Sequence, residues 1–517
     1  MAVLSAILLI LGFPDFEVWR LAFVALVPLL LAVDGEYESP RSSFTVGWIF
    51  GTVFFFGSCW WLTFAPITYA GLPWPPVYFL MLCAAIGAGI FPAVFTMMLA
   101  ILRRRFGWFA IALAPVVWVF SEFFRMWVSG NNWNALGYSV AFSLPPAISA
   151  ARVGGVYAVS FIIVAINVLV YLIVSGRRTL RLITTRKPME ARNAPLLGSV
   201  IVLTGFLVVA AVYLSLDRSQ STKPDTSGDT VIVAVQPNVP MDGLTLEEYR
   251  ALLNRHVELA EVELAKRPAG DRRPALVVFP ESPMMFEYGR DADLRDFLRR
   301  FAERNRAAVL INSAEMSDDG KQILNSAVMI NESGAKVGQY DKIFLLPFGE
   351  YIPFPEPVAS WMPAFVGNFK KGTEYDLLPV GEAKAGIMIC FESHFGGLSA
   401  EYARDGANLL IEMTNDGYLG RTPVLRQHLA NAVFRAIETG RPVIRVTNVG
   451  ITGYIDPDGH VSDSPEPYTE ASRSWAVNGR LVSGVSFYSR FGDLFAILLS
   501  IATVGLTGAA LLGRRSV

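Results

Sequence analysis

The sequence predicts a protein in two parts, a bundle of about eight membrane-spanning α-helices and an α/β domain. Hydrophobic residues make up 53% of the chain and charged residues only 17%, which is too apolar for one soluble enzyme of this length. The apolar residues are also unevenly distributed. Long apolar runs fill residues 1–216 and 491–512, whereas residues 217–484 have the mixed composition of a soluble domain. The net charge of −1 gives no indication of nucleic-acid binding.

A helix needs roughly 20 apolar residues to cross the hydrocarbon core of a bilayer. The runs that approach this length are 2–12, 19–33, 44–65, 77–102, 107–128, 155–175, 195–216 and 491–512. The first run is short, and it lacks the basic flank and cleavage site of a removable signal peptide. It is therefore either a minimal span or the remainder of a longer one.

Basic residues predict how these spans are oriented. They cluster after the fourth span, between the sixth and seventh, and at the C-terminus. The residues are Arg103, Arg104, Arg105, Arg177, Arg178, Arg181, Arg186, Lys187, Arg192, Arg514 and Arg515. With eight spans all three clusters fall on one side, which the positive-inside rule assigns to the cytoplasm. The domain at 217–490 then lies on the far side of the membrane.

The soluble part has the alternating pattern of an α/β domain. After a polar linker at 217–229, strand-like runs occur at 231–236, 276–279, 308–312, 326–330, 385–389, 408–413 and 442–447. Helical patterns occur at 245–266, 291–305, 396–405 and 423–439. We therefore expect a membrane bundle at 1–216, the linker at 217–229, an extracytoplasmic catalytic domain at 230–484, and a final span with its tail at 485–517.

Cysteine usage draws attention to one residue. Of the three cysteines, Cys59 and Cys83 lie within predicted spans, and Cys390 is alone in its domain, at the end of the apolar run 386–389. A free cysteine is most often a small buried hydrophobic residue. In a compartment that normally pairs cysteines, however, an unpaired one indicates a reactive thiol.

Two further stretches favour the reactive thiol. The apolar run 276–279 leads into Pro-Glu-Ser-Pro with Glu281, and Lys342 stands beside the apolar residues 343–346. Taken singly, Glu281 is an acidic turn residue and Lys342 a surface lysine. Together with Cys390 in this order they resemble the nitrilase superfamily. The motifs at 347–353, 414–416 and 445–453, with the membrane segments, extend the resemblance over nearly the whole chain, to the membrane-embedded branch formed by the apolipoprotein N-acyltransferases.

The resemblance implies a four-layer αββα sandwich and a Glu-Lys-Cys triad. Cys390 is then the nucleophile, Glu281 the base, and Lys342 the group that lowers the pKa of the thiol and stabilises the oxyanion. Glu350 and Glu392 have supporting roles, with Glu350 beside the lysine. The implied reaction is ping-pong: a phospholipid acyl chain moves to Cys390 as a thioester and then to the α-amine of a diacylglyceryl-cysteine on an apolipoprotein. No metal or cofactor is implied.

The resemblance also implies a cellular location. The protein is expected in the bacterial inner membrane as a multi-pass monomer, with its catalytic domain in the periplasm. Two positions depart from the family pattern. Phe391 stands where the family has tyrosine, and Tyr418 stands where it has tryptophan. Both are candidate substrate-binding residues.

An apolar, proline-rich arm at 352–370 contains the other two candidates for lipid contact, Trp361 and Phe365. Proline prevents a regular helix here, and exposed aromatic residues suit a membrane interface. The arm is therefore either a mobile gate for lipid or a loop packed on its own domain.

Three other functions stay open from the residues alone. A membrane-tethered amidohydrolase would use the same triad and pass the thioester to water. A transporter or scaffold would carry an inert domain, although Glu122 and Arg125 are the only oppositely charged pair within one span, which is little for a transport path. A Cys–His protease would need His394 or His428 as its base.

Overall fold

The computed structural model describes the chain except for residues 144–145, 184–227, 242, 353–368, 479–483 and 513–517. The chain forms two compact units. The helical unit comprises Met1–Gln220, Leu419–Ala430 and Phe491–Val517. The α/β unit comprises Ser221–Tyr418 and Asn431–Arg490. The predicted span at 195–216 and most of the arm at 352–370 lie outside the described residues.

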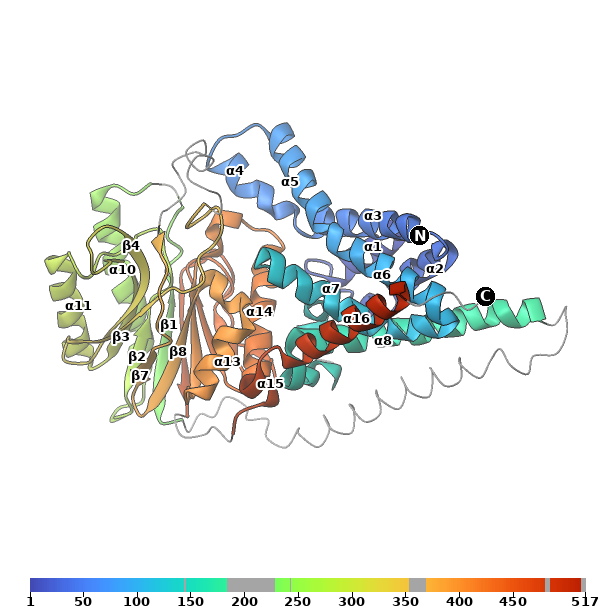
Figure 1. Cartoon of the computed structure of the whole chain (residues 1–517). Coiled ribbons are helices and arrows are strands. Elements are labelled where there is room, and N and C mark those ends of the chain that lie inside the picture. Colours follow the sequence, from blue (N-terminus) through green and yellow to red (C-terminus); the bar gives the residue numbers. More distant parts are fainter. Residues whose placement is uncertain (144–145, 184–227, 242, 353–368, 479–483, 513–517) are drawn as a thin grey trace. The chain divides into compact units, whose positions relative to one another are not determined.

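The helical unit contains long apolar helices joined by short turns (Figure 1). Its helices are α1 (Ala2–Gly12), α2 (Val27–Glu36), α3 (Pro40–Ser58), α4 (Phe64–Thr68), α5 (Trp74–Ala88), α6 (Ile90–Phe106), α7 (Ala114–Ser129), α8 (Ala151–Ile183) and α16 (Leu494–Leu512). In the described residues, four helical stretches are long and apolar enough to cross a membrane. A fifth is added if Pro40–Ser58 and Trp60–Thr68, which meet at 59°, form one broken span.

The prediction of one span at 19–33 was wrong. The structure has a 3-10 turn at Trp19–Phe23 and then the short helix α2, with Pro28 in its first turn. Proline is well tolerated in the first turn of a helix but interrupts the hydrogen bonds of a longer one. The apolar run is therefore divided into two short elements.

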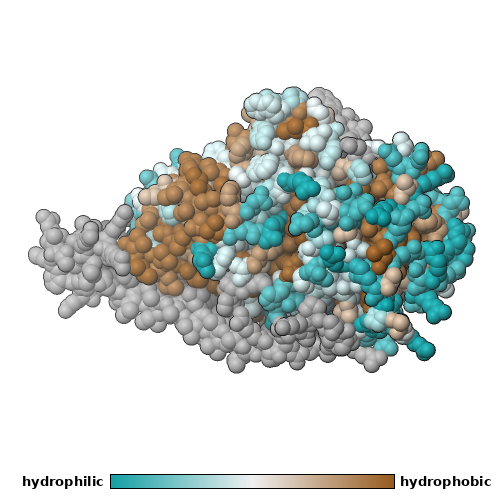
Figure 2. Space-filling model, turned by 180° about the vertical axis from the view of Figure 1, so that it is seen from behind, coloured by the Kyte–Doolittle hydropathy of each residue, from teal (hydrophilic) through white to brown (hydrophobic). Residues whose placement is uncertain are grey.

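Small residues bring α3 and α6 close together. A Cβ on Gly47 would lie 2.2 Å from the Thr96 hydroxyl and 2.5 Å from the Pro92 carbonyl oxygen. Only glycine fits at such a separation, and membrane helices use small residues in this way to gain packing contacts. Figure 2 shows apolar side chains gathered on the face of this unit, as a lipid-facing surface requires.

Residues 419–430 pack with the helical unit, although the sequence predicted them as part of the catalytic domain. The buried side chain of Gln427 accepts hydrogen bonds from Trp61 Nε1 (3.0 Å) and Trp133 Nε1 (2.9 Å). Its amide nitrogen donates to the carbonyls of Ser58 (2.9 Å) and Pro14 (3.2 Å). A buried amide with both polar atoms fully bonded holds this segment in place.

Glu122 and Arg125 lie on one face of α7, but in the described bundle they bind other partners and form no direct ion pair. Glu122 Oε1 accepts from Trp118 Nε1 (2.8 Å) and from the backbone N–H of Leu136 (2.7 Å). Arg125 donates to Asn132 (2.9 Å).

The α/β unit is a sandwich of two sheets covered by helices (Figure 1). The first sheet has the order β13-β1-β2-β3-β4-β5, with β6 beside β4. Its strands are β1 (Thr230–Gln236), β2 (Ala275–Val278), β3 (Ala308–Met316), β4 (Ile323–Ile330), β5 (Lys336–Asp341), β6 (Phe369–Lys370) and β13 (Ala471–Val477). Helices α10 (Leu246–Leu264) and α11 (Ala292–Asn305) cover it and pack into its apolar core.

The second sheet has the order β12-β11-β10-β9-β8-β7. Its strands are β7 (Leu377–Val380), β8 (Ala383–Ile389), β9 (Leu409–Thr414), β10 (Val443–Thr447), β11 (Gly453–Ile455) and β12 (Val461–Ser462). Helix α13 (Gly396–Arg404) lies on its outer face, α14 spans Val424–Thr439, and α15 spans Phe487–Phe491. The sequence pattern did not predict β5 or β13, because polar residues interrupt their apolar runs.

Parallel pairing in the two sheets places candidate residues at strand ends. In the first sheet β2 runs parallel to β1 and β3, and in the second β8, β9 and β10 are parallel. These strands are buried and rich in branched apolar residues, as expected for strands covered on both faces. Glu281 follows β2 and Cys390 follows β8, so each lies at a carboxyl end, where α/β proteins form their sites.

We predict that Gly386→Ala destabilises the α/β unit. A Cβ on Gly386 would lie 2.5 Å from the ring of Tyr402 on α13, whose hydroxyl donates to the Ile387 carbonyl (2.7 Å) and so restrains the ring. The free energy of unfolding should fall by about 1–3 kcal/mol. Thermal unfolding of the purified protein in detergent measures the change. Gly397→Ala is the matched control, because nothing lies within 4 Å of the added carbon; equal melting temperatures for the two variants would contradict the packing argument.

Candidate active site

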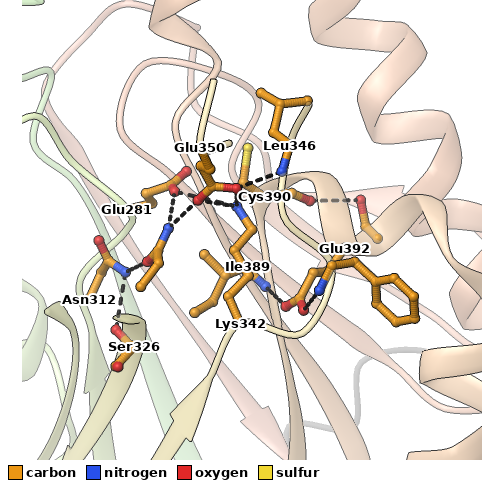
Figure 3. A network of polar contacts seen from close by, with 12 residues as sticks. Glu281, Asn312, Ser326, Lys342, Leu346, Glu350, Ile389, Cys390 and Glu392 are labelled. Carbon is orange, nitrogen blue, oxygen red and sulfur yellow. Dashed lines mark hydrogen bonds and ion pairs between the residues drawn. The ribbon is translucent and has the colours of Figure 1, made fainter. Parts of the chain in front are cut away.

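Cys390 begins a sharp turn directly after β8. It is the first residue of the 3-10 turn Cys390–His394, and its φ is +53°. This left-handed conformation is uncommon for a residue with a side chain, and strain of this kind is concentrated at functional sites. The turn changes the chain direction from β8 into α13 and leaves the sulfur at the strand end (Figure 3).

Lys342 follows β5 and is buried, with 1% of its side chain exposed. Its ammonium lies 2.9 Å from Oε1 and 2.8 Å from Oε2 of Glu350, and 3.9 Å from Oε1 of Glu281. Burying a charge is costly unless it is paired. The interpretation of Lys342 as a surface lysine is therefore wrong, and Glu350 is its main partner.

Glu281 faces both Cys390 and Lys342 (Figure 3). Its side chain is 17% exposed, and the neighbouring Cys390 thiol slightly lowers the pKa of its carboxyl group. Its Oε1 also accepts a hydrogen bond from Asn325 Nδ2 at 3.0 Å. The three residues predicted as a triad thus lie together in the structure.

Asn325 is a member of the site that sequence reasoning missed. It lies on β4, and its Nδ2 donates to Glu281 and also to Glu350 Oε1 (2.7 Å). Asn312 on β3 donates to Asn325 Oδ1 (2.7 Å). The available signal was an asparagine beside an apolar run in each of two strands, since a buried asparagine needs specific partners.

Glu392 connects the cysteine turn to the segment after Lys342. Its fully buried Oε1 accepts hydrogen bonds from Tyr340 Oη (2.7 Å) and the backbone N–H groups of Ile343 (2.7 Å) and Phe344 (3.0 Å). Its Oε2 accepts from the N–H of Ile389 (2.8 Å). Four donors on one side chain fix the strand end that carries Cys390 against the loop that carries Lys342.

A second buried charge cluster stabilises the segment after β9. Arg445 on β10 donates to Glu412 on β9 and to Asp416 Oδ2 (2.8 Å), and all three side chains are buried. Thr414, at the end of β9, lies close enough to Cys390 to lower the pKa of its thiol. The motifs at 414–416 and 445–453 therefore meet beside the nucleophile through this arginine.

The electrostatics of the site keep a proton on the thiol. Burial raises the pKa of Cys390 well above its usual value, Glu281 raises it further, and Lys342 only partly opposes this. Burial also raises the pKa of Glu281, against the lowering effect of Lys342. Burial lowers the pKa of Lys342, but Glu350 and Glu281 more than offset it, so the lysine stays charged. Lys342 does lower the pKa of the thiol, as expected, but burial outweighs its effect.

The predicted substrate-binding residues have different surroundings. Phe391 is buried, with its ring stacked on that of His394 at 5.4 Å and edge-on to Phe395. Tyr418 is 53% exposed. Trp361 and Phe365 lie outside the described residues. Of the histidines considered for a protease, His394 packs on Phe391, and His428 packs on Trp133 in the helical unit.

Comparisons with known proteins cover both parts of the chain. The family described as apolipoprotein N-acyltransferase N-terminal domain matches residues 5–169, and the carbon-nitrogen hydrolase family matches residues 234–484. The apolipoprotein N-acyltransferase of Geobacter metallireducens is 32% identical, over 100% of this chain and 96% of its own length. That of Allorhizobium ampelinum is 30% identical, over 98% and 96% respectively.

The chain belongs to the apolipoprotein N-acyltransferase family. It is therefore an acyltransferase of lipoprotein biosynthesis that carries a carbon-nitrogen hydrolase domain, and the amidohydrolase, scaffold and protease alternatives are not favoured. Similar solved structures include an amidase from Nesterenkonia sp. (16% identity, 54% of this chain and 100% of that one, TM-score 0.38) and a carbon-nitrogen hydrolase from Helicobacter pylori (15%, 55% and 94%, TM-score 0.37).

We predict that Glu392→Gln reduces acyl transfer by at least about tenfold. A glutamine has one acceptor oxygen, so its amide nitrogen would face N–H donors at Ile389 or at Ile343 and Phe344. Turnover with lipid substrates in detergent measures the effect. Tyr340→Phe is the milder control, because it removes one donor and leaves the carboxylate in place; a Glu392→Gln enzyme as active as this control would contradict the tethering role.

Proposed function

We propose that the enzyme moves an acyl chain from a membrane phospholipid, through a thioester on Cys390, to the α-amino group of the N-terminal diacylglyceryl-cysteine of an apolipoprotein. The observation that carries the proposal is that Glu281 faces the Cys390 thiol, with the Lys342 ammonium 3.9 Å from the same carboxylate. A nucleophile, a base and a fixed cation are the groups that acyl transfer through cysteine requires.

In the first half-reaction Glu281 takes the thiol proton as the sulfur attacks the sn-1 ester carbonyl. The raised pKa of Cys390 means that the resting thiol is protonated, so proton transfer accompanies the attack. The C–O bond of the ester then breaks, and the proton held by Glu281 passes to the departing alkoxide. A lysophospholipid leaves, and Cys390 carries the acyl chain.

In the second half-reaction the α-amine attacks the thioester carbonyl. Glu281 accepts a proton from the nitrogen, the C–S bond breaks, and the proton returns to the sulfur. The amide product forms with no net change in protons and no oxidant or reductant. In both steps negative charge develops on the carbonyl oxygen, and Lys342 is the charged group positioned to stabilise it, because Glu350 fixes its ammonium.

We infer the cellular location of the reaction from the helical unit. We propose about eight spans in the bacterial inner membrane, with the α/β unit in the periplasm. The basic residues at 103–105, 177–192 and 514–515 support this orientation. The acyl donor and the acceptor are both lipids, which is consistent with an enzyme anchored in the bilayer as a monomer.

We predict that protein purified from membranes carries one acyl chain on Cys390, removable with hydroxylamine. Cys390→Ala should abolish the added mass, and Glu281→Gln should slow thioester formation by about 10²–10⁴-fold, the usual contribution of a general base. Intact-mass analysis after incubation with phospholipid measures both. Cys83→Ala is the control, since Cys83 is an exposed residue of α5. An acyl mass that persists in Cys390→Ala would refute the assignment of the nucleophile.

We predict that a reporter active only in the cytoplasm is silent when fused after residue 225. The same reporter fused after Arg105 should be active, because the basic turn that ends α6 is assigned to the cytoplasm. Reporter activity in whole cells distinguishes the two sides. Strong activity of the first fusion would reverse the topology and remove periplasmic lipoproteins as acceptors.

A further inference from the structure

The two carboxylates of the site are joined by one neutral side chain. Asn325 Nδ2 donates one hydrogen to Glu281 Oε1 (3.0 Å) and the other to Glu350 Oε1 (2.7 Å). Both oxygens also face the Lys342 ammonium, at 3.9 Å and 2.9 Å. The asparagine therefore lies between the glutamate that accepts the thiol proton and the glutamate that holds the lysine.

We propose that Asn325 is a positioning residue for the reaction, whose amide occupies Oε1 of Glu281 and leaves Oε2 as the oxygen that exchanges the proton with Cys390. This inference rests on the proposed role of Glu281 as the base. A carboxylate has two oxygens that a base can use, and a donor fixed on one of them directs the proton to the other.

The network around Asn325 prevents its amide from turning over. Its Oδ1 accepts a hydrogen bond from Asn312 Nδ2 (2.7 Å), and the same Asn312 nitrogen donates to the Ser326 carbonyl (3.1 Å). In the reversed orientation an oxygen would face two carboxylates and an NH₂ would face another NH₂. Asn312 thus holds Asn325 in the one orientation that gives both glutamates a donor.

No other common side chain meets these requirements. Asparagine offers two hydrogens on one nitrogen and adds no charge. An aspartate here would place a third carboxylate beside Glu281 and Glu350, with only the buried Lys342 to compensate. Like charges at this separation cannot all ionise, so one would hold a proton.

The charged and titratable groups that face Glu281 come from several elements. Lys342 follows β5, Glu350 lies in the turn after it, and Cys390 follows β8. Glu392 acts on Lys342, and Asp416 acts on Cys390. In addition to these charged groups, the hydrogen bond from the neutral Asn325 lowers the pKa of Glu281. Removing this hydrogen bond raises the pKa of Glu281, so the base is protonated at pH values where it is ionised in the wild type. As the pH falls, the variant therefore loses activity at a higher pH than the wild type does.

The test is the pH profile of thioester formation on Cys390. The full-length protein is incubated in detergent micelles with phospholipid from about pH 5 to 9, and intact mass gives the rate at each pH. The acid limb of the profile, where the rate falls as Glu281 becomes protonated, should move to higher pH by about one pH unit in Asn325→Ala. This is the scale of one charge-assisted hydrogen bond. Asn325→Asp should move it further in the same direction, because of the added carboxylate.

Two more variants separate positioning from folding. Asn312→Ala removes the restraint on the Asn325 amide, together with a hydrogen bond to the Ser326 carbonyl, and should move the acid limb in the same direction by less. It touches neither glutamate, so it provides the test if Asn325→Ala fails to fold. Asn331→Ala is the control. Asn331 lies just after β4, the strand that carries Asn325, and its side chain accepts hydrogen bonds from Ser333 and Ala335 in its own turn. The pH profile of Asn331→Ala should match that of the wild type.

The outcomes distinguish this inference from the function on which it rests. A wild-type acid limb in both Asn325→Ala and Asn312→Ala, or a rate reduced equally at every pH, overturns the positioning role and leaves Asn325 as a structural residue. If Glu281→Gln forms the thioester at the wild-type rate, the assignment of the base itself fails. An inactive Glu281→Gln together with unmoved asparagine profiles defeats only the inference about Asn325.

Discussion

The buried ion pair between Lys342 and its two glutamates is the interaction on which the rest of the site depends. An ammonium that is 1% exposed loses its hydration, and this cost is recovered only with well-placed carboxylates. Glu350 supplies two oxygens within 2.9 Å, and Glu281 completes the pair at 3.9 Å. Glu281 in turn faces the Cys390 thiol, so the lysine, the base and the nucleophile are positioned together.

The site is assembled by strands that are far apart in sequence and belong to different sheets. In the first sheet Glu281 follows β2, Asn325 lies on β4 and Lys342 follows β5, whereas Cys390 follows β8 of the second sheet. Glu392 joins the sheets directly, since its two oxygens accept from Ile389 at the end of β8 and from Ile343 and Phe344 after β5. This connection keeps the neutral thiol and the base aligned.

The helical unit follows a different physical rule. In lipid there is no hydrophobic gain from helix association, so close packing at small residues and satisfied polar groups hold the bundle together. Gly47 packs closely against Thr96. Gln427 is a satisfied polar group, because its amide oxygen and nitrogen are bonded to Trp61, Trp133 and two backbone carbonyls. The sequence around Gln427 gave no sign of that role, because the partners of this residue lie 294 to 413 positions earlier in the chain.

What the sequence by itself determined were local features. The strands that end near 279 and 389, and the apolar runs of α6, α7, α8 and α16, follow from composition and periodicity, because neighbouring residues decide them. The roles expected of Glu281, Lys342 and Cys390 came instead from the resemblance of their motifs to a known family. Only the tertiary structure decided that Lys342 is buried, that burial outweighs the lysine at the Cys390 thiol, that Phe391 packs inward, and that Asn325, Asn312 and Arg445 complete the site. The reason is that desolvation and hydrogen-bond partners depend on which distant strands become neighbours, and a local pattern of residues does not determine which strands those are.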